Sequence, residues 1–513
     1  MATTPFLWMI ILPIGAAPLI YLVGRFEARR AAPRARSAAA WLALLALLLT
    51  WIPFGLTARQ FAAYGAQSLA VEAIPLRFDG LSLLLTIVAL GLGTLVTLFS
   101  CPAMCRKPGE EKYYAMLVTM VGVMIALGMA GDLFNLWVWF ETMAVSSYLL
   151  VVFNQEEPAS LEAGVKYVVQ SAIGSVLVLI GIALTLLSTG TLDLQQIAAQ
   201  ASASPLLLAA GALFVIGFGV KAALVPMHTW LPDAHTQAPS GISAMLSGVV
   251  IEAGLVAMLR ALAPLTGVGG QGFPAATWGG LLIGMGALNM IVGNLMALRQ
   301  VQVKRMLAYS SLSHMGYMVF GLGVAIYAGQ AAGAQGGMFH LFNHGLMKGL
   351  AFLSAGALLY VISDAAVEHD PHAGHKALTV ADLNGAAQRY PVAALAFSLA
   401  VLGLGGLPPL AGFMSKWQIF VAGFSAHNTL IAGLVIFAAL NSVLSLGYYA
   451  PLVNAMYRKQ PSPAILNGGA LPLRMGLPLA VLAVLVLLFG LWPGLAQGFT
   501  APAGQAILAA FGG

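Results

Sequence analysis

Long apolar stretches separated by short polar ones make up most of this chain. Fourteen of them reach about 20 residues, the length that a helix needs to cross a bilayer. They lie at residues 5–24, 38–57, 80–100, 113–131, 133–153, 163–188, 206–225, 240–262, 277–298, 306–328, 335–361, 391–423, 428–457 and 475–497. The pattern predicts an all-α polytopic membrane protein with about 14 transmembrane helices.

Proline interrupts two of the predicted helices, and each of them carries a lone lysine. Lys221 precedes Pro226, Pro232 and Pro239 in GFGVKAALVPMHTWLPDAHTQAPS, and Lys416 lies in LGLGGLPPLAGFMSKWQIF. Proline removes a backbone donor and clashes with the preceding turn, so a continuous helix is not expected at either place. A broken helix beside an ionisable group is how many transporters build an ion site at mid-membrane depth. Two such places predict an internal repeat that moves ions.

Composition supports the membrane class, because 60% of the 513 residues are hydrophobic and only 8% are charged. A soluble protein of this length cannot bury so much apolar surface. If the N-terminus faces outside, seventeen of the 23 basic residues fall on the cytoplasmic side and only Arg59, Arg77 and Arg260 on the other. The positive-inside rule thus predicts an inner (cytoplasmic) membrane protein with both termini outside. The net charge of +6 then reflects topology and anionic lipid, and it is no argument for nucleic-acid binding.

Motifs for cofactors are missing from the sequence. Nothing has the ligand spacing of an iron–sulfur cluster or haem, and no glycine-rich dinucleotide fingerprint or P-loop is found. We therefore expect no cofactor, no cofactor-binding residue and no nucleotide hydrolysis by this chain. Cys101 and Cys105 are expected to be two inert thiols. The N-terminal stretch lacks a basic segment and a cleavage site, so it is interpreted as a first span.

Two carboxylates stand in the middle of predicted spans, where they are costly unless they pair with a cation or bind a proton. Glu141 either forms a structural ion pair or belongs to a polar chain with the intramembrane lysines. Glu252 has no basic residue within a helical turn, so a partner from another helix or a proton must neutralise it. His228, between the first prolines, either passes protons or caps the broken helix.

A second group of titratable residues shares one predicted helix. His340, His344 and Lys348 are spaced i, i+4 and i+8, which puts them on one face. Such a stripe in an apolar helix predicts a wet, proton-conducting path. Zinc is the rival interpretation, since i, i+4 histidines can ligate a metal, but lysine as the third member counts against it. His314, on the preceding span, is either a relay or a packed core histidine.

The most polar part of the chain is the loop at residues 362–389. His369, His372 and His375 beside Asp370 allow a surface metal site, and a solvated cytoplasmic loop that touches a partner is the favoured alternative. Other features are expected to be structural. Residues 66–80 alternate weakly and suggest a short outer hairpin. Lys166 and Lys304 are expected near the cytoplasmic boundary, as is His235, which either passes protons or caps the broken helix. The spans from 428 onward, without buried charges, are interpreted as scaffold.

Five stretches together resemble the antiporter-like membrane subunits of respiratory complex I (NADH:quinone oxidoreductase), energy-converting hydrogenases and Mrp cation/proton antiporters. They are GDLFNLWVWFE, VKAALVPMHTWLPDAHTQAPS, VKRMLAYSSLSHMGY, FHLFNHGLMKGLAFLSAG and GGLPPLAGFMSKW. As a set they are highly specific, their order is that of the family, and they cover roughly residues 80–460. Among the members of this family, the residues of GDLFNLWVWFE and of VKYVVQ…GTLDLQQI are most similar to the Mrp D subunit and the hydrogenase-linked branch.

The resemblance implies two inverted five-helix repeats, each with a broken helix. The expected parts are scaffold helices at 1–112, a first half-channel at 113–262, a second at 277–457 and a C-terminal scaffold helix at 458–513. It also implies that Glu141 pairs with Lys221, that His344 and Lys348 lie on a central polar axis, and that Lys416 is the terminal lysine. One departure is Glu252, where the family commonly has lysine or histidine.

The expected function is proton translocation by a subunit of a complex I-related, redox-driven ion pump. Its partners are expected to be other membrane subunits, peripheral redox subunits and the bilayer. No catalytic or metal-binding residue is assigned. The alternative is a sodium/proton antiporter subunit of an Mrp-type secondary transporter. A non-transporting scaffold is disfavoured, because too many titratable groups lie at membrane depth.

Overall fold

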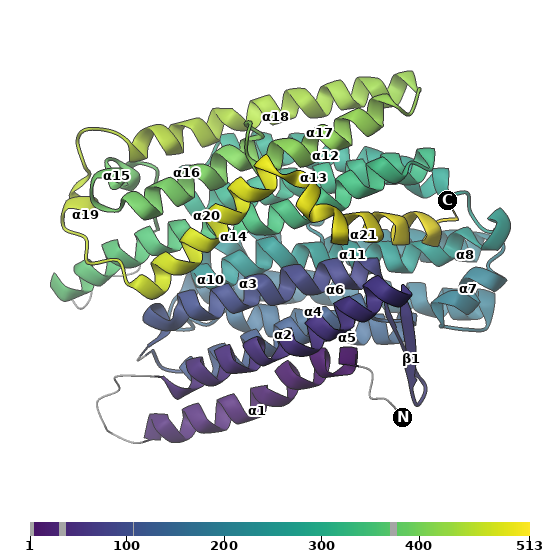
Figure 1. Cartoon of the computed structure of the whole chain (residues 1–513), viewed down its shortest axis with the longest axis horizontal. Coiled ribbons are helices and arrows are strands. Elements are labelled where there is room, and N and C mark those ends of the chain that lie inside the picture. Colours follow the sequence, from purple (N-terminus) through teal and green to yellow (C-terminus); the bar gives the residue numbers. More distant parts are fainter. Residues whose placement is uncertain (1–4, 30–36, 106, 370–376, 513) are drawn as a thin grey trace.

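The computed structural model describes residues 5–29, 37–105, 107–369 and 377–512, nearly all of them in helices that run side by side along one axis (Figure 1). The first half of the chain contains η1 (Pro5–Leu7), α1 (Trp8–Arg29), α2 (Ala38–Tyr64), β1 (Gln67–Val71), β2 (Ile74–Phe78), α3 (Gly80–Met104), α4 (Glu110–Gly128), α5 (Leu133–Val151), α6 (Pro158–Thr189), α7 (Leu194–Gln200), α8 (Pro205–Lys221), α9 (Trp230–Gln237), α10 (Ser240–Met245), the π-helical turn η2 (Leu246–Val250), α11 (Ile251–Leu262), η3 (Ala263–Thr266) and η4 (Val268–Gly270).

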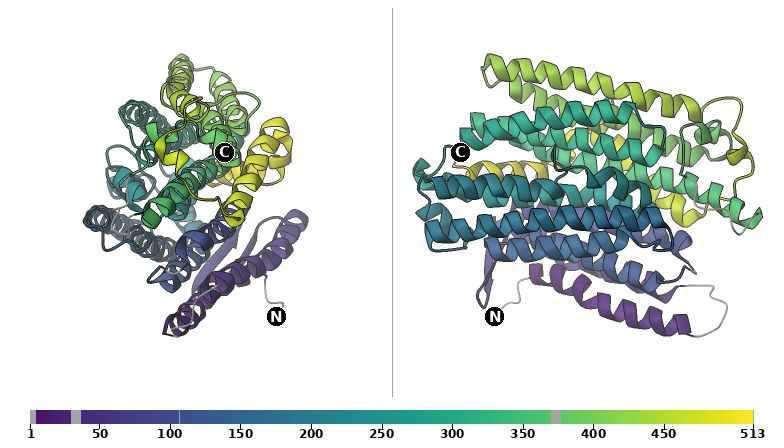
Figure 2. Two further views of the ribbon diagram at one scale, coloured as in Figure 1. Left: turned by 90° about the vertical axis from the view of Figure 1, so that its left-hand side faces the viewer. Right: turned by 180° about the vertical axis from the view of Figure 1, so that it is seen from behind.

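The second half continues the bundle. It contains α12 (Ala275–Leu298), α13 (Val303–Ala328), α14 (Ala331–His369), η5 (Ala381–Leu383), α15 (Ala386–Arg389), α16 (Pro391–Gly405), α17 (Ala411–Phe424), α18 (Thr429–Met456), α19 (Pro463–Leu466), α20 (Leu473–Leu491), η6 (Pro493–Ala496) and α21 (Gln497–Ala510). Viewed down the long axis, the helices form an elongated group with α1 and α2 at one edge and α18 at the other (Figure 2).

Eleven helical segments in the described residues are long and apolar enough to cross a membrane. The other three predicted spans fall on α5, on α8 with α9, and on α16 with α17. Each of those pairs consists of short helices separated by a break, and the count of fourteen spans stays a prediction. The last crossing differs from its predicted range, because α20 ends at Leu491 and α21 then continues to the end of the bundle that holds the C-terminus (Figure 1).

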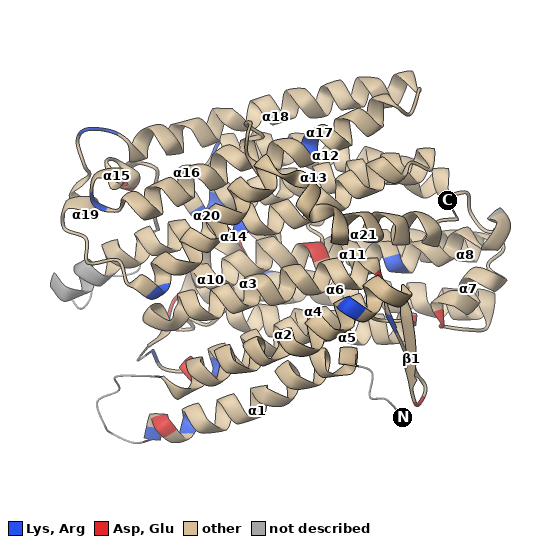
Figure 3. Cartoon of the chain, in the orientation of Figure 1, with Lys and Arg blue, Asp and Glu red and all other residues tan. Residues whose placement is uncertain are grey.

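The two ends of the bundle differ in charge. Both termini, the β1–β2 hairpin and α7 lie at one end, which we call the terminal end (Figures 1 and 2). The α3–α4, α12–α13 and α18–α19 connections lie at the other, where Lys and Arg are most frequent (Figure 3), and which we call the basic end. The predicted hairpin is present, with Gln67 opposite Phe78 and Val71 opposite Ile74.

Both proline-rich interruptions break their helices. The first leaves residues 222–229 between α8 and α9, and the second leaves residues 406–410 between α16 and α17. Lys221 is the last residue of α8, and Lys416 lies in the second turn of α17. A third irregularity was not foreseen. The π-helical turn η2 joins α10 to α11 just before Glu252, in a segment that is buried throughout, and such turns recur at functional sites.

Close backbone contact holds α12 against α13. A Cβ atom on Gly286 of α12 would meet the nitrogen of Phe320 at 2.6 Å and the carbonyl oxygen of Gly316 at 2.8 Å. Only glycine fits at such a distance, and small residues of this kind are what allow membrane helices to pack backbone to backbone. The α12–α13 pair therefore forms a rigid wall for the polar groups of the second half.

Candidate functional site

The first intramembrane lysine is held by aromatic and hydroxyl groups. Lys221 is fully buried, and its ammonium donates to the hydroxyl of Tyr167 at 2.7 Å and to that of Ser147 at 3.5 Å. The Tyr167 ring stacks on Trp230, with ring centroids 4.0 Å apart. The Trp230 indole in turn donates to the carbonyl of Val220 at 2.7 Å, which satisfies one of the carbonyls left open where α8 ends.

Glu141 does not form the expected ion pair with Lys221. No carboxylate of residues 107–369 contacts the Lys221 ammonium as an ion pair, and one carboxylate oxygen of Glu141 has no hydrogen-bond partner. The implied pairing is therefore corrected for this conformation. In this conformation the ammonium donates to hydroxyls of α5 and α6 instead, and Glu141 acts on it electrostatically from beyond ion-pair distance. Glu141 remains half-buried on α5.

His228 and a charged cluster occupy the region between α8 and the basic end. His228 lies in the break, and its Nδ1 atom is buried without a hydrogen-bond partner. Nearby in sequence, Asp233 of α9 pairs with Lys166 at 2.9 Å and with Arg305 at 2.7 Å. Lys166 is half exposed and also pairs with Glu162. It therefore lies at the boundary where the sequence places it.

The centre of the molecule contains a buried carboxylate–imidazole pair. Glu252 of α11 and His344 of α14 meet at 2.8 Å, and neither side chain has exposed surface. The partner that Glu252 requires therefore comes from another helix, as its sequence context predicts. The second carboxylate oxygen of Glu252 and the Nε2 atom of His344 have no partner, so both remain free to exchange a proton or bind water.

Two further histidines continue from this pair toward α17. His314 of α13 and His340 of α14 meet at 3.1 Å, and His340 Nδ1 lies 2.9 Å from the Ser415 hydroxyl. That hydroxyl also lies 3.3 Å from two carbonyl oxygens of its own helix, to which only a donor can bond. The direction of the two histidine bonds depends on the tautomer of each ring, so the series can carry a proton either way between His314 and Ser415.

The remaining two lysines have no carboxylate partner in the described part of the chain. Lys348 donates to the carbonyl of Leu307 at 2.8 Å and to the hydroxyl of Ser310. Lys416 donates to the carbonyl of Leu404 and to the hydroxyl of Ser442, each at 2.8 Å, and lies over the ring of Tyr317. Carbonyls and hydroxyls solvate these ammonium groups as water would, and they leave no counter-charge.

Two groups close to the basic end are buried inside the protein, which the sequence did not indicate. Lys304 is almost fully buried and donates to the carbonyls of Thr236 and Ala238 at the end of α9. His235 is fully buried against the Phe352 ring, with neither ring nitrogen hydrogen-bonded. Both were expected near the cytoplasmic boundary. Their positions close to polar loop residues gave no sign of burial, because the packing of α9 against α13 is a tertiary contact.

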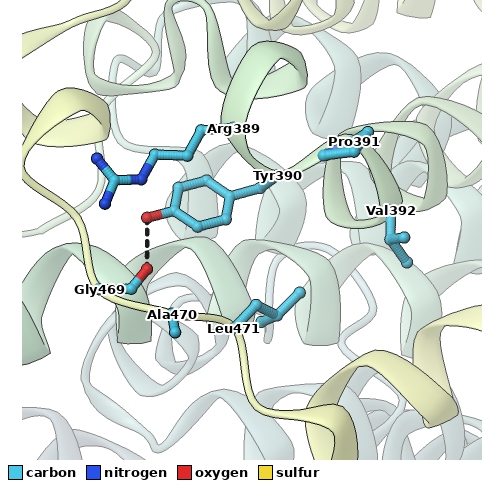
Figure 4. A pocket seen from close by; sticks show the side chains of 7 residues that line it. All are labelled: Arg389, Tyr390, Pro391, Val392, Gly469, Ala470 and Leu471. Atoms are coloured by element: carbon cyan, nitrogen blue, oxygen red, sulfur yellow. Dashed lines mark hydrogen bonds between the residues drawn. The ribbon is translucent and has the colours of Figure 1, made fainter.

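Metal binding has no support in the described residues, where no group of three His, Cys, Asp or Glu side chains is arranged to hold an ion. His369, His372 and His375 lie outside the residues whose side chains are described. A surface hollow of about 290 Å³ lies at the start of α16 (Figure 4), where the Tyr390 hydroxyl donates to the carbonyl of Gly469. Arg389 on its wall is already bonded to backbone carbonyls, so this hollow is a seam between loops.

A family model described as "NADH:quinone oxidoreductase/Mrp antiporter, TM" matches residues 130–445. The chain belongs to this family. The match includes both broken helices and all nine candidate residues of the proton path. The predicted class of all-α, multi-pass integral membrane protein is thereby confirmed. The two-repeat boundaries, the likeness to one branch and the roles of single residues stay predictions.

Named relatives agree with this family. NADH-quinone oxidoreductase subunit N 1 of Sorangium cellulosum is 37% identical over 405 residues, which cover 77% of this chain and 76% of the relative. F(420)H(2) dehydrogenase subunit N of Methanosarcina mazei is 31% identical over 463 residues, or 88% of this chain and 90% of that one. Both relatives are aligned along most of their length.

Solved structures show the same fold. A chain of the membrane-bound sulfane sulfur reductase, an archaeal respiratory membrane complex, superimposes with a TM-score of 0.85 and 27% identity over 99% of each chain. A chain of the Mrp complex from Dietzia superimposes with a TM-score of 0.84 over 100% of each chain. At 21% identity, this second match shows the fold alone.

Proposed function

We propose that this chain is the proton-translocating, antiporter-like subunit of a complex I-related, redox-driven ion pump. The observation that carries the proposal is the file of fully buried titratable side chains in the second half. Its members are Glu252, His344, His314, His340, Lys348 and Lys416. So many ionisable groups in an apolar interior are expensive, and they mark ion pathways.

Two hydrogen-bonded groups within the file support the proposed proton transfer, and the His314 and His344 rings between them have centroids 5.5 Å apart. Hydrogen bonds or ion pairs join Glu252 to His344, and His314 through His340 to Ser415, which precedes Lys416 in the chain. A positive charge on Lys348 disfavours a second one on His344 one turn away, while Glu252 favours it. The central pair is therefore sensitive to the protonation of its neighbours, and a proton that arrives at one group tends to expel one from the next.

Lys221, Glu141 and His228 form the first half of the proposed path. In the observed arrangement Tyr167 holds the Lys221 ammonium, and one oxygen of the Glu141 carboxylate has no hydrogen-bond partner. A change in a neighbouring subunit that alters the charge near Glu141 would shift Lys221 between these two partners. The proposed half-channels are residues 113–262 and 277–457, flanked by scaffold at 1–112 and 458–513.

The proposed partners are other membrane subunits and peripheral redox subunits. The named relatives are subunits of NADH-quinone oxidoreductase and F(420)H(2) dehydrogenase, and the structural relatives come from multi-subunit complexes. We place the protein in the inner (cytoplasmic) membrane, with the basic end inside and both termini outside, because lysine and arginine gather at the basic end (Figure 3).

The second candidate is a sodium/proton antiporter subunit without a redox partner. The matching family includes Mrp antiporters as well as oxidoreductases, so membership does not decide between the two functions. The oxygens around Lys348 and Lys416 already bind ammonium groups, and no carboxylate pairs with either lysine in the described residues. A sodium ion at either place would be repelled by the ammonium charge, which favours proton exchange over sodium binding.

The test is ion transport by the purified parent complex in liposomes, wild type against Lys221→Ala, with and without sodium. Acidification that follows electron flow, ignores sodium and disappears in the variant supports the redox-driven pump. Transport that needs sodium and no electron donor would make this an antiporter subunit. Unchanged pumping and redox turnover in Lys221→Ala would remove Lys221 from the path.

A further inference from the structure

Helix α18 carries a buried polar stripe that its lack of charges concealed. Asn441, Ser442, Ser445, Tyr448 and Tyr449 are spaced i, i+1, i+4, i+7 and i+8, so they share one helical face. We call them the α18 stripe. Four of the five are at least 97% buried, and Ser442 bonds inward to Lys416. The opposite face is apolar and exposed, with Leu440 and Val443 both more than 60% exposed. The stripe therefore faces the protein interior.

Two members of the stripe lie close to the lysines of the proposed path. The Lys416 ammonium donates to Ser442 at 2.8 Å. The Tyr449 hydroxyl faces Ser310, the residue to which Lys348 donates. Lys416 therefore contacts the stripe directly at Ser442, and Lys348 is connected to it through the hydroxyl of Ser310.

A third member, Tyr448, bonds to a residue of α12 that lies near the basic end of the bundle. Tyr448 donates to the side-chain oxygen of Asn294 at 2.9 Å, and Asn294 in turn donates to the side chain and carbonyl of Asn441. Asn294 is four residues before the end of α12 at Leu298, which is about one helical turn or 6 Å. Tyr448 is eight residues before the end of α18 at Met456. The stripe thus lies between mid-membrane depth and the basic end, and it stops about 12 Å before the end of α18.

Tyr449 is the one member of the stripe whose side-chain polar group makes no well-aligned hydrogen bond. Its ring is fully buried and lies against the ring of Tyr448, with centroids 4.4 Å apart. Its hydroxyl lies beside both Ser310 and Tyr448 but makes no well-aligned hydrogen bond. An unbonded buried hydroxyl lowers stability, and a phenylalanine would fill the same space without that cost. Packing alone therefore does not account for this hydroxyl.

We propose that the α18 stripe is the proton-uptake route from the basic end to Lys348, with Tyr449 as its gate. The inference rests on the proposed function and names the route by which protons reach Lys348. In one transfer, a neutral Lys348 amine takes the proton of Ser310, Ser310 takes that of Tyr449, and Tyr449 takes that of Tyr448. Tyr448 takes one from a hydronium ion that has entered from the basic end as far as Asn294. Each hydroxyl is neutral again afterwards, water remains, and the net result is one ammonium on Lys348.

Asn294 is a positioning residue in this route. In the observed state the side-chain oxygen of Asn294 accepts a hydrogen bond from the Tyr448 hydroxyl. This bond directs the hydroxyl hydrogen away from Tyr449. Transfer requires two hydroxyl rotations: that of Tyr448 toward Tyr449, and that of Ser310 from the carbonyl of Leu307, to which it donates at 2.9 Å, toward Lys348. The structure accordingly shows the closed state of the route.

The test uses the assembled complex in liposomes and compares Tyr449→Phe with Tyr113→Phe. Tyr113 is an equally buried tyrosine whose hydroxyl lies 2.7 Å from Ser100, between α3 and α4 and away from the path. We expect Tyr449→Phe to slow proton translocation by a factor on the order of 10 to 100, the usual range for loss of a positioned proton-transfer group. Tyr113→Phe should pump at the wild-type rate. The ratio of rates in H2O and D2O should rise only in Tyr449→Phe, since a purely structural loss does not alter it.

Tyr448→Phe is the second variant, and it decides the matter if Tyr449→Phe does not assemble. Wild-type pumping in either assembled variant would overturn the route while leaving the proposed function intact. A wild-type complex that moves no protons would overturn both. If neither variant assembles while Tyr113→Phe does, the stripe is structural and the route is wrong.

Discussion

The carboxylate of Glu252 and the imidazole of His344 meet 2.8 Å apart in the centre of the molecule, and both are shielded from solvent and lipid. This pair joins α11, which follows the first broken helix, to α14 of the second half. A buried carboxylate with one histidine partner can exist either as an ion pair or as two neutral groups related by transfer of a proton. It is therefore suited to pass a charge between the two halves without moving a helix.

Replacing Glu252 with glutamine should stop this exchange. The amide keeps the shape and a hydrogen bond to His344 but cannot take up a proton. We expect proton translocation to fall by a factor on the order of 10 to 100, with assembly retained. Glu162→Gln, which removes an exposed carboxylate that pairs with Lys166, is the control and should pump normally. Pumping at the wild-type rate in assembled Glu252→Gln would exclude the central pair from the path.

Tyr167 should be the main partner of Lys221 in the resting state. Tyr167→Phe keeps the stacking on Trp230 but removes the acceptor at 2.7 Å. Since hydrogen bonds to charged groups contribute about 1.5–3 kcal/mol, the free energy of unfolding should drop by roughly that amount. Tyr148→Phe, a partly exposed ring in edge contact with Tyr167, is the matched control. Thermal unfolding of the purified complex measures both, and equal midpoints for the two variants would contradict the assignment.

Asp79 and Arg260 should stabilise the terminal end in a pH-dependent way. Arg260 contacts both carboxylate oxygens of Asp79, at 2.8 and 3.1 Å. Burial raises the pKa of Asp79, but the charge and hydrogen bonds of Arg260 outweigh burial and hold it below its ordinary value. Because the folded pKa is depressed, the stabilisation is complete above about pH 4, the pKa of an unfolded aspartate, and is lost as pH falls through the folded value.

Asp79→Asn should therefore lower stability by roughly 3–5 kcal/mol, as expected when one partner of a buried ion pair is removed. The difference from wild type in unfolding midpoint should be the same at pH 7 and pH 5 and should shrink only below about pH 4. A difference that already shrinks between pH 7 and pH 5 would show that Arg260 does not depress the pKa of Asp79.

The glycine contact between α12 and α13 offers a test of packing with an internal control. Gly286→Ala would place a methyl group 2.6 Å from the nitrogen of Phe320, whereas a Cβ on Gly284 meets nothing within 4 Å. We expect Gly286→Ala to destabilise by about 1–3 kcal/mol, the usual cost of overpacking, and Gly284→Ala to be neutral or slightly stabilising. Indistinguishable unfolding midpoints would show that the two helices can move apart freely.

The sequence predicted much of this arrangement because charge in an apolar helix is conspicuous. Lys221, Lys416 and the His340–His344–Lys348 series stand out from their surroundings, and proline indicated both breaks. The sequence could not show which neutral side chains bond to these charged groups. Ser147, Ser310 and Ser415 look like ordinary small residues, and their roles depend on which helices meet. The i, i+4, i+7 spacing on α18 was visible in the sequence, but an interpretation based on charges alone treated that helix as scaffold.

The direction in which the Glu252 side chain points depends on the number of residues in the π-helical turn η2. Such a turn holds one residue more than the α-helix around it, and each residue of an α-helix turns the chain by about 100°. Without that extra residue, α11 would be rotated by this angle relative to α10, and the carboxylate would point along a different radius from the one that meets His344. A single additional residue in the helix, with no reactive group of its own, therefore sets the orientation of the Glu252 carboxylate toward His344.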